Sequence, residues 1–199
     1  MMNFAAIFDR IPKFVLFSAA GVIQIGLIGL MLFDRTEILR TGRDVTLRTR
    51  PLDPRDFLRG DYVTLGYDIS SVPAGALKGE RSAGWGTPVF VKIAPDREGF
   101  YEAISVHAVP IDVTSPEVLI RGHVGFGANC GEQHRAFCEK LDVRYGIESY
   151  FVPEGEGRKL ENARNQRQLT VVAAVAPTGR AAIKRLLIDG APAYDEPWF

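Results

Sequence analysis

Two cysteines and a histidine lie at equal spacing late in the chain. Cys130, His134 and Cys138 occupy positions i, i+4 and i+8, which would place three metal ligands on one face of a helix. His123 could be a fourth ligand, but three ligands without a clear fourth fall short of a closed zinc site. In an oxidising compartment the cysteines would instead pair, and closing this short loop would stabilise the fold by about 2.5 kcal/mol. We expect a Cys130–Cys138 disulfide, with free thiols as the remaining alternative, and we assign no metal and no cofactor.

The other polar residues form no familiar catalytic pattern. The chain contains no H-E-x-x-H motif, no glycine-rich phosphate loop and no Ser-His-Asp order. His107 and His123 lie among apolar neighbours, where a hydrogen-bonded structural histidine is expected. Asp142 and Glu148 have a charge opposite to that of Arg144, which is typical of a solvated strand face. The residues therefore indicate no catalytic site, and we expect no enzyme activity.

The composition is that of an ordinary globular protein, with one dense apolar block near its start. The 199 residues include 24 basic and 24 acidic side chains, and 46% of them are apolar. Beyond the first 33 residues the chain has 22 basic and 23 acidic side chains, which gives no long-range attraction for polyanions. We therefore expect no nucleic-acid partner.

The apolar block, residues 14–33, predicts a transmembrane helix. It holds twenty residues without a charge, and a helix of that length spans about 30 Å of hydrocarbon. A cleaved signal peptide would have a shorter apolar region followed by small residues, whereas Asp34 and Arg35 come directly after Phe33. We expect a retained signal anchor, so that the lipid bilayer is one partner of the chain.

The span divides the chain into four parts. We expect a cytoplasmic N-terminus at 1–13, the anchor at 14–33, a juxtamembrane segment at 34–43 and a periplasmic domain at 44–199. A count of flanking basic residues favours the opposite orientation, because more arginines follow the span than precede it. Long domains are translocated largely regardless of their charge, however, and the paired cysteines suit the periplasm of a bacterial inner-membrane protein.

The domain is predicted to be mainly β, as a sandwich or a partly open barrel. Short runs of alternating or apolar residues are separated by proline and glycine, which is the pattern of such folds. The predicted strands are residues 44–50, 62–69, 88–94, 100–109, 117–124, 142–151, 169–176 and 181–188. A loop is expected at 70–86, and one short helix at 156–167 with Leu160 and Ala163 as its apolar positions.

Two blocks of the sequence resemble a known family. Residues 60–67 read GDYVTLGY and match every specified position of G-D-Y-x-x-L-x-Y, the motif that names the GDYXXLXY family of bacterial membrane-anchored proteins. Residues 144–157, RYGIESYFVPEGEG, are similar to the second block of that family. The resemblance implies an inner-membrane protein of uncharacterised function that often accompanies polytopic membrane proteins, and it brings no catalytic residues.

The motif also has a physical interpretation of its own. Gly60 and Asp61 are typical of a turn, and the strand that follows would turn Leu65 and Tyr67 to the core and Tyr62 to the other side. We expect a turn and strand that define the fold. The alternative is a ligand or partner surface formed by Tyr62 and the preceding charged residues, which are Arg55, Asp56 and Arg59.

The Arg59–Gly60–Asp61 turn, coming after a membrane anchor, is also similar to that of type I signal peptidases. Those enzymes need a serine nucleophile near the span and a buried lysine as its base. Residues 34–67 contain neither serine nor lysine; Ser70 and Ser71 come later, and Lys78 and Lys92 stand in no recognisable pattern. A hydrolase without a recognisable Ser-Lys dyad is thus the weaker hypothesis.

These observations together favour a single-span inner-membrane protein that acts by binding other envelope proteins. A polytopic membrane protein is the expected partner. The alternative from a different class is a periplasmic module that binds a small ligand, which would require a deep and partly apolar pocket.

Overall fold

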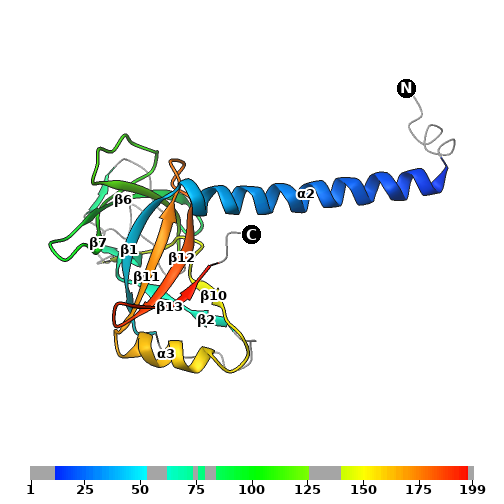
Figure 1. Cartoon of the computed structure of the whole chain (residues 1–199). Helices are drawn as coiled ribbons and strands as arrows, with labels where there is room; N and C mark the ends of the chain where they lie inside the picture. The colour runs from blue at the N-terminus through cyan, green and yellow to red at the C-terminus, as the bar shows by residue number, and fades with distance from the viewer. Residues whose placement is uncertain (1–11, 53–61, 74–75, 79–83, 126–139, 197–199) are drawn as a thin grey trace. The chain divides into compact units, whose positions relative to one another are not determined.

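The computed structural model describes residues 12–52, 62–73, 76–78, 84–125 and 140–196. The chain forms two compact units, divided between Glu37 and Ile38. The first contains most of the helix α2 (Lys13–Thr41), which is continuous and uncharged from Phe14 to Phe33 (Figure 1). Among the described residues α2 is the one helix whose length and composition would allow it to cross a membrane.

The α2 helix changes character near its C-terminal end. Its apolar side chains before Glu37 are exposed, as at Phe17 (77%) and Met31 (73%), except for the half-buried Leu16. Ile38 and Leu39, in contrast, are buried against Ala174 and Ala182 of the second unit. The helix ends at Thr41, and the amide of the following Gly42 donates to the carbonyl of Ile38 at 2.9 Å. The last turn of α2 therefore belongs to the core of the second unit.

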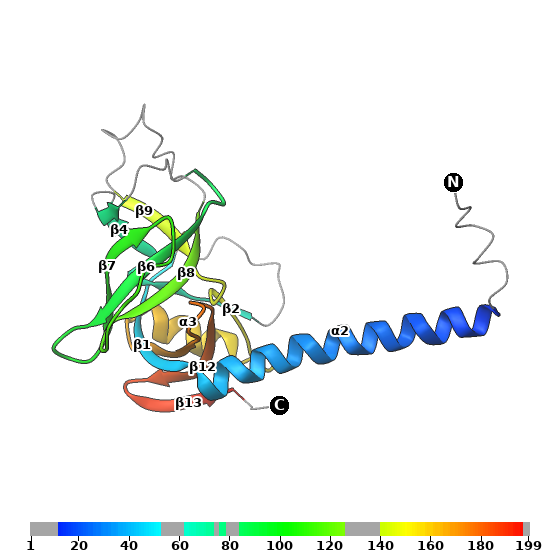
Figure 2. The same ribbon diagram turned by 90° about the horizontal axis from the view of Figure 1, so that it is seen from above.

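The second unit is mainly β and forms a nearly closed, barrel-like arrangement, which confirms the predicted fold class (Figures 1 and 2). One sheet has the order β13 (Ala191–Asp195), β12 (Ala181–Ile188), β11 (Leu169–Val175), β1 (Arg43–Arg50) and β3 (Gly66–Tyr67). A second has the order β4 (Ser71–Pro73), β9 (Lys140–Arg144), β8 (Val118–Val124), β6 (Pro88–Pro95), β7 (Tyr101–His107) and β5 (Leu77–Lys78). A ribbon of two strands pairs β10 (Ser149–Phe151) with β2 (Tyr62–Thr64). The helix α3 (Gly157–Asn165) follows β10, and a short 3-10 turn, η1 (Asp68–Ser70), follows β3.

Alternation of side chains along several strands builds the main core between the sheets. Val45 and Leu47 of β1 are fully buried, as are the alternate residues Val91 and Ile93 of β6. A β-strand presents every second side chain to the same face. Only one register of each strand therefore places these apolar side chains in the core. Leu160 and Ala163 of α3 are also buried, as their spacing predicts.

Contacts between the sheets close the barrel on two sides. Thr46 of β1 forms a bridge with Phe100, and the Arg48 guanidinium lies 4.1 Å from the Phe100 ring centroid and 2.8 Å from the Asp96 carboxylate. On the other side, the amide of Arg121 in β8 donates to the carbonyl of Gly179 at 2.8 Å. The turn between β11 and β12 is therefore fixed to the edge of β8.

Several predicted elements differ from the structure. The single strand predicted at 62–69 is divided into β2, β3 and η1, and the run 142–151 is divided into β9 and β10 by a turn at Gly146. The loop predicted at 70–86 contains β4 and β5, and β13 was not predicted. Strands of two or three residues have too few positions for a periodic signal, and β2, β3, β4 and β10 pair with strands that are remote in the sequence. β13 pairs with the neighbouring β12, but it contains Pro192, which weakens a strand signal.

Gly179 offers a test of the barrel closure. Its φ is +83°, and an added Cβ would lie 3.0 Å from the Arg121 nitrogen; Gly190 has φ +79° with no atom within 4 Å of that position. In both alanine variants the left-handed backbone conformation should lower the free energy of unfolding by about 1–2 kcal/mol. Only Gly179→Ala also crowds β8, which should lower it by about 1–3 kcal/mol more. Urea unfolding of the full chain in detergent should therefore show a larger loss for Gly179→Ala. Equal losses would contradict the close packing of this turn on β8.

Candidate functional site

The two sequence blocks that resemble the family lie directly against each other. β2, from the first block, pairs in antiparallel register with β10, from the second, so that Val63 faces Tyr150. Beyond this ladder the amide of Leu65 donates to the carbonyl of Glu148 at 2.7 Å. Segments more than 80 residues apart in the sequence thus form one two-stranded unit.

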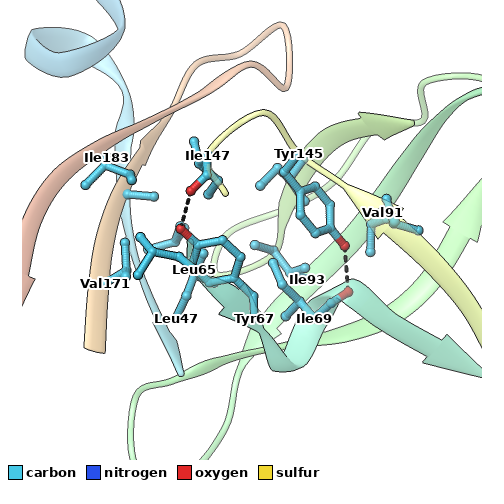
Figure 3. Close-up of a cluster of buried hydrophobic side chains, with 14 of the residues drawn as sticks. Leu47, Leu65, Tyr67, Ile69, Val91, Ile93, Tyr145, Ile147, Val171 and Ile183 are labelled. Atoms are coloured by element: carbon cyan, nitrogen blue, oxygen red, sulfur yellow. Dashed lines mark hydrogen bonds between the residues drawn. The ribbon is translucent and has the colours of Figure 1, made fainter. Parts of the chain in front are cut away.

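Two buried tyrosines join these segments further. The Tyr67 hydroxyl donates to the carbonyl of Ile147 at 2.5 Å, and the Tyr145 hydroxyl donates to the carbonyl of Ile69 at 2.7 Å (Figure 3). Tyr67 is fully buried, and Tyr145 is 6% exposed. The first block therefore supplies a phenol to the main chain of the second, and the second supplies one to Ile69, two residues beyond the first block; we call these two bonds the tyrosine clamp.

Burial keeps both phenols in the neutral form that can donate. Removal from water raises the pKa of Tyr67 and of Tyr145 well above the ordinary range, and the nearby Glu148 carboxylate raises both further. The tyrosines consequently remain hydrogen-bond donors at any physiological pH, and neither is available as a phenolate nucleophile.

Glu148 shapes the turn between the two strands of the second block. Its carboxylate accepts hydrogen bonds from the amides of Tyr145 (2.5 Å) and Gly146 (2.9 Å), and Gly146 adopts φ +81°. The prediction that Glu148 lies on a solvated strand face is therefore wrong. Its side chain closes a turn that places the Ile147 carbonyl opposite Tyr67.

Arg164 supports the first block from the other side. This residue of α3 is 1% exposed, and its guanidinium donates to the carbonyls of Thr64 and, at 3.4 Å, Leu52. Its remaining donors bind the Asn165 side chain at 3.0 and 3.1 Å, and burial lowers its pKa. No sequence pattern indicated this role, because an arginine in a polar helix is normally a surface residue.

The structure assigns different tasks to the motif residues singled out from the sequence. Leu65 and Tyr67 are buried, which agrees with a motif strand that defines the fold. Tyr62 is half-buried, and its ring lies 5.8 Å from that of Phe151, which is 78% exposed. Arg59, Gly60 and Asp61 lie outside the described residues, as do Arg55 and Asp56.

The cysteine site also lies outside the described residues. This applies to Cys130, His134 and Cys138, so the disulfide stays a prediction. His123, the candidate fourth ligand, is an exposed residue of β8 and does not have the structural hydrogen-bonding role expected for it among the described contacts. Within the described ranges no three His, Cys, Asp or Glu residues are grouped so that they could hold a metal ion.

The sequence did not indicate one serine–histidine pair whose residue types suit a nucleophile and its base, Ser105 and His107. The Ser105 hydroxyl and the Nε2 atom of His107 lie 2.8 Å apart on β7, a distance that suits a serine and its general base. Ser105 is only 3% exposed, however, so a substrate carbonyl cannot approach its hydroxyl. Lys92 faces Ser105 across β6 and β7, but its ammonium binds the Glu117 carboxylate at 2.7 Å. Ser70, a candidate from the sequence, is also buried.

An open cleft of about 580 Å³ provides space for a ligand within the described domain. It lies between the segment 110–119 and the ends of β1 and β11. Its lining residues are Thr41, Arg43, Pro110, Ile111, Asp112, Val113, Ser115, Glu117, Val118, Leu119, Val175, Ala176 and Pro177. The lining is mostly apolar, with Arg43 as its cation, and no sequence signal indicated it because its walls come from three distant segments.

Comparison with known proteins gives one result. The family model described as GDYXXLXY protein matches residues 24–186, which include most of α2, both motif blocks and nearly all of the β domain. No curated protein and no solved structure matches the chain.

The tyrosine clamp predicts a specific pattern of stability. Tyr67→Phe and Tyr145→Phe each keep the ring but leave one buried carbonyl without its donor, which should cost about 1–3 kcal/mol per variant. Because both bonds join the same two segments, the double variant should lose less than the sum of the two single losses. Urea unfolding of the full chain in detergent measures all three.

Tyr101→Phe is the matched control, since the hydroxyl of Tyr101 is bound at 3.5 Å in an exposed position. Its expected loss is below about 0.5 kcal/mol. A clamp variant that behaves like this control would show that the phenol bonds do not stabilise the junction of the blocks.

Proposed function

Since the chain belongs to the GDYXXLXY family, we propose that it is a single-span protein of the bacterial inner membrane that binds other envelope membrane proteins. The observation that carries this proposal is the exposed apolar surface of α2. Twenty consecutive residues of the helix, from Phe14 to Phe33, are uncharged. None of the most apolar part of the helix is buried within the chain. A surface of that size needs lipid or protein around it.

Binding explains the β domain better than catalysis does. Its buried hydroxyl groups and its buried guanidinium are used within the fold, as in the tyrosine clamp and Arg164. The one serine–histidine pair noted above is closed to substrate because Ser105 is buried. We propose that the domain is not an enzyme, and that it faces the periplasm, where the predicted Cys130–Cys138 disulfide would form.

A second candidate function rests on the cleft. An open volume of about 580 Å³, whose lining is mostly apolar and includes the charged residues Arg43, Asp112 and Glu117, is of a size that suits a small amphipathic ligand. The cleft is largely open to solvent, however, whereas sites for small molecules usually enclose most of the ligand surface. Protein binding therefore remains the first proposal.

Gentle isolation from native membranes tests the proposal. The full chain, crosslinked in the membrane and purified in a mild detergent, should bring down a polytopic membrane protein in stoichiometric amount. Recovery of the monomer alone would contradict the accessory role.

A topology measurement provides the control. Protease added outside intact spheroplasts should digest the β domain and leave a fragment of the anchor in the membrane. Digestion only after the cells are opened would place the domain in the cytoplasm and overturn the proposed location.

A further inference from the structure

One wall of the cleft is an extended segment whose main chain is unpaired. From Val109 to Val113 no main-chain group bonds another described residue. Ile111 and Val113 are half-buried and Asp112 between them is exposed, which is the alternation of a strand with one face against the protein. The segment thus has the side-chain pattern of an edge strand and lacks the partner strand.

The floor of the cleft is a second open edge. In β8 the Arg121 amide points away from β6 and donates to Gly179. Antiparallel pairing alternates, so the main-chain groups of Leu119, two residues earlier, point to the same side. No described residue bonds them there. Gly179 also lies near the Leu119 carbonyl, at 3.3 Å from the position of an added Cβ, but it forms a hydrogen bond only at Arg121, and Leu119 lines the cleft.

Arg43 is the cation of the cleft, whose lining also holds two carboxylates: Glu117, which is bound by Lys92 at 2.7 Å, and Asp112, which is exposed. Its guanidinium donates to the Ser115 hydroxyl at 3.2 Å and to the Glu117 carbonyl at 3.5 Å, both neutral acceptors. No described carboxylate forms an ion pair with it, whereas the Asp44 carboxylate next to it binds Lys184 at 2.9 Å. An exposed guanidinium with long bonds to neutral acceptors retains its capacity to bind a carboxylate in a bidentate manner.

We propose that the cleft binds an extended segment of a partner membrane protein, which adds as a strand along Ile111–Val113 and the open edge of β8 and places a carboxylate on Arg43. Main-chain hydrogen bonds would provide affinity, and the apolar lining would receive alternate side chains of the segment. The inference rests on the proposed function, because it names the surface through which that function operates.

Site-specific photocrosslinking in native membranes tests the inference. Benzoylphenylalanine is placed in the full chain at Val113, in the cleft, or at Ile104, a residue of β7 that is 51% exposed and does not line the cleft. We expect crosslinks to one membrane protein from position 113 and not from position 104. Mass spectrometry of the linked peptide should show apolar residues with an Asp or Glu among them.

Arg43 variants then test whether the crosslink at Val113 depends on the charge of Arg43 in the cleft. With the crosslinker at Val113, Arg43→Gln should reduce the product about tenfold, since it removes a hydrogen-bonded charge, and Arg43→Lys should restore part of it. Arg43 is exposed, so the fold should tolerate both changes.

The outcomes distinguish the two proposals. Product at position 113 that is unchanged in Arg43→Gln, or a linked peptide without a carboxylate, would overturn the binding mode. Crosslinking at position 104 alone would overturn the cleft as the site but leave the accessory function standing. If neither position gives a product and the chain is recovered as a monomer, both proposals fail.

Discussion

The hydrogen bonds of Tyr67 and Tyr145 are the constraint on which the arrangement of the β domain depends. Tyr67 donates to the Ile147 carbonyl of the second block at 2.5 Å, and Tyr145 donates at 2.7 Å to the carbonyl of Ile69, just beyond the first block, in a region closed to water. A buried carbonyl without a donor is costly, so the two blocks can be buried only together. The pairing of β2 with β10 and the bond from Leu65 to Glu148 extend the same junction along the main chain.

This junction gives a physical reason for the motif that defines the family. In G-D-Y-x-x-L-x-Y the leucine fills the core and the last tyrosine forms half of the clamp. Between them lies Gly66, where an added Cβ would meet Leu52 and Arg50 at 3.0–3.1 Å. The chain passes at that point from the ribbon with β10 to the sheet with β1. The first tyrosine, Tyr62, is different, because it lies beside the exposed Phe151 and is not part of the core.

Sequence patterns predicted those parts of the molecule that depend on local periodicity. The apolar run from Phe14 to Phe33 predicted the helix, and period-two alternation predicted the buried faces of β1 and of residues 63–69. The division of residues 62–69 among different partner strands could not be predicted, because it depends on Glu148 and on β1, which are remote in the sequence. The cleft could not be predicted from the sequence for the same reason, since its lining comes from residues 41–43, 110–119 and 175–177.

The residues that stabilise the fold and those of the proposed partner site thus lie in different parts of the domain. The clamp and Arg164 use polar groups to hold the fold, whereas the partner segment that we propose would bind at Leu119 and Arg43. Native-state hydrogen exchange of the full chain in detergent tests the central role of the clamp most directly. The Leu65 amide should exchange with the free energy of global unfolding, within about 1 kcal/mol of Val171 in the middle of the five-stranded sheet. Exchange of Leu65 at a much lower free energy, while Val171 stays protected, would show that the two blocks separate without unfolding the domain and would contradict the account.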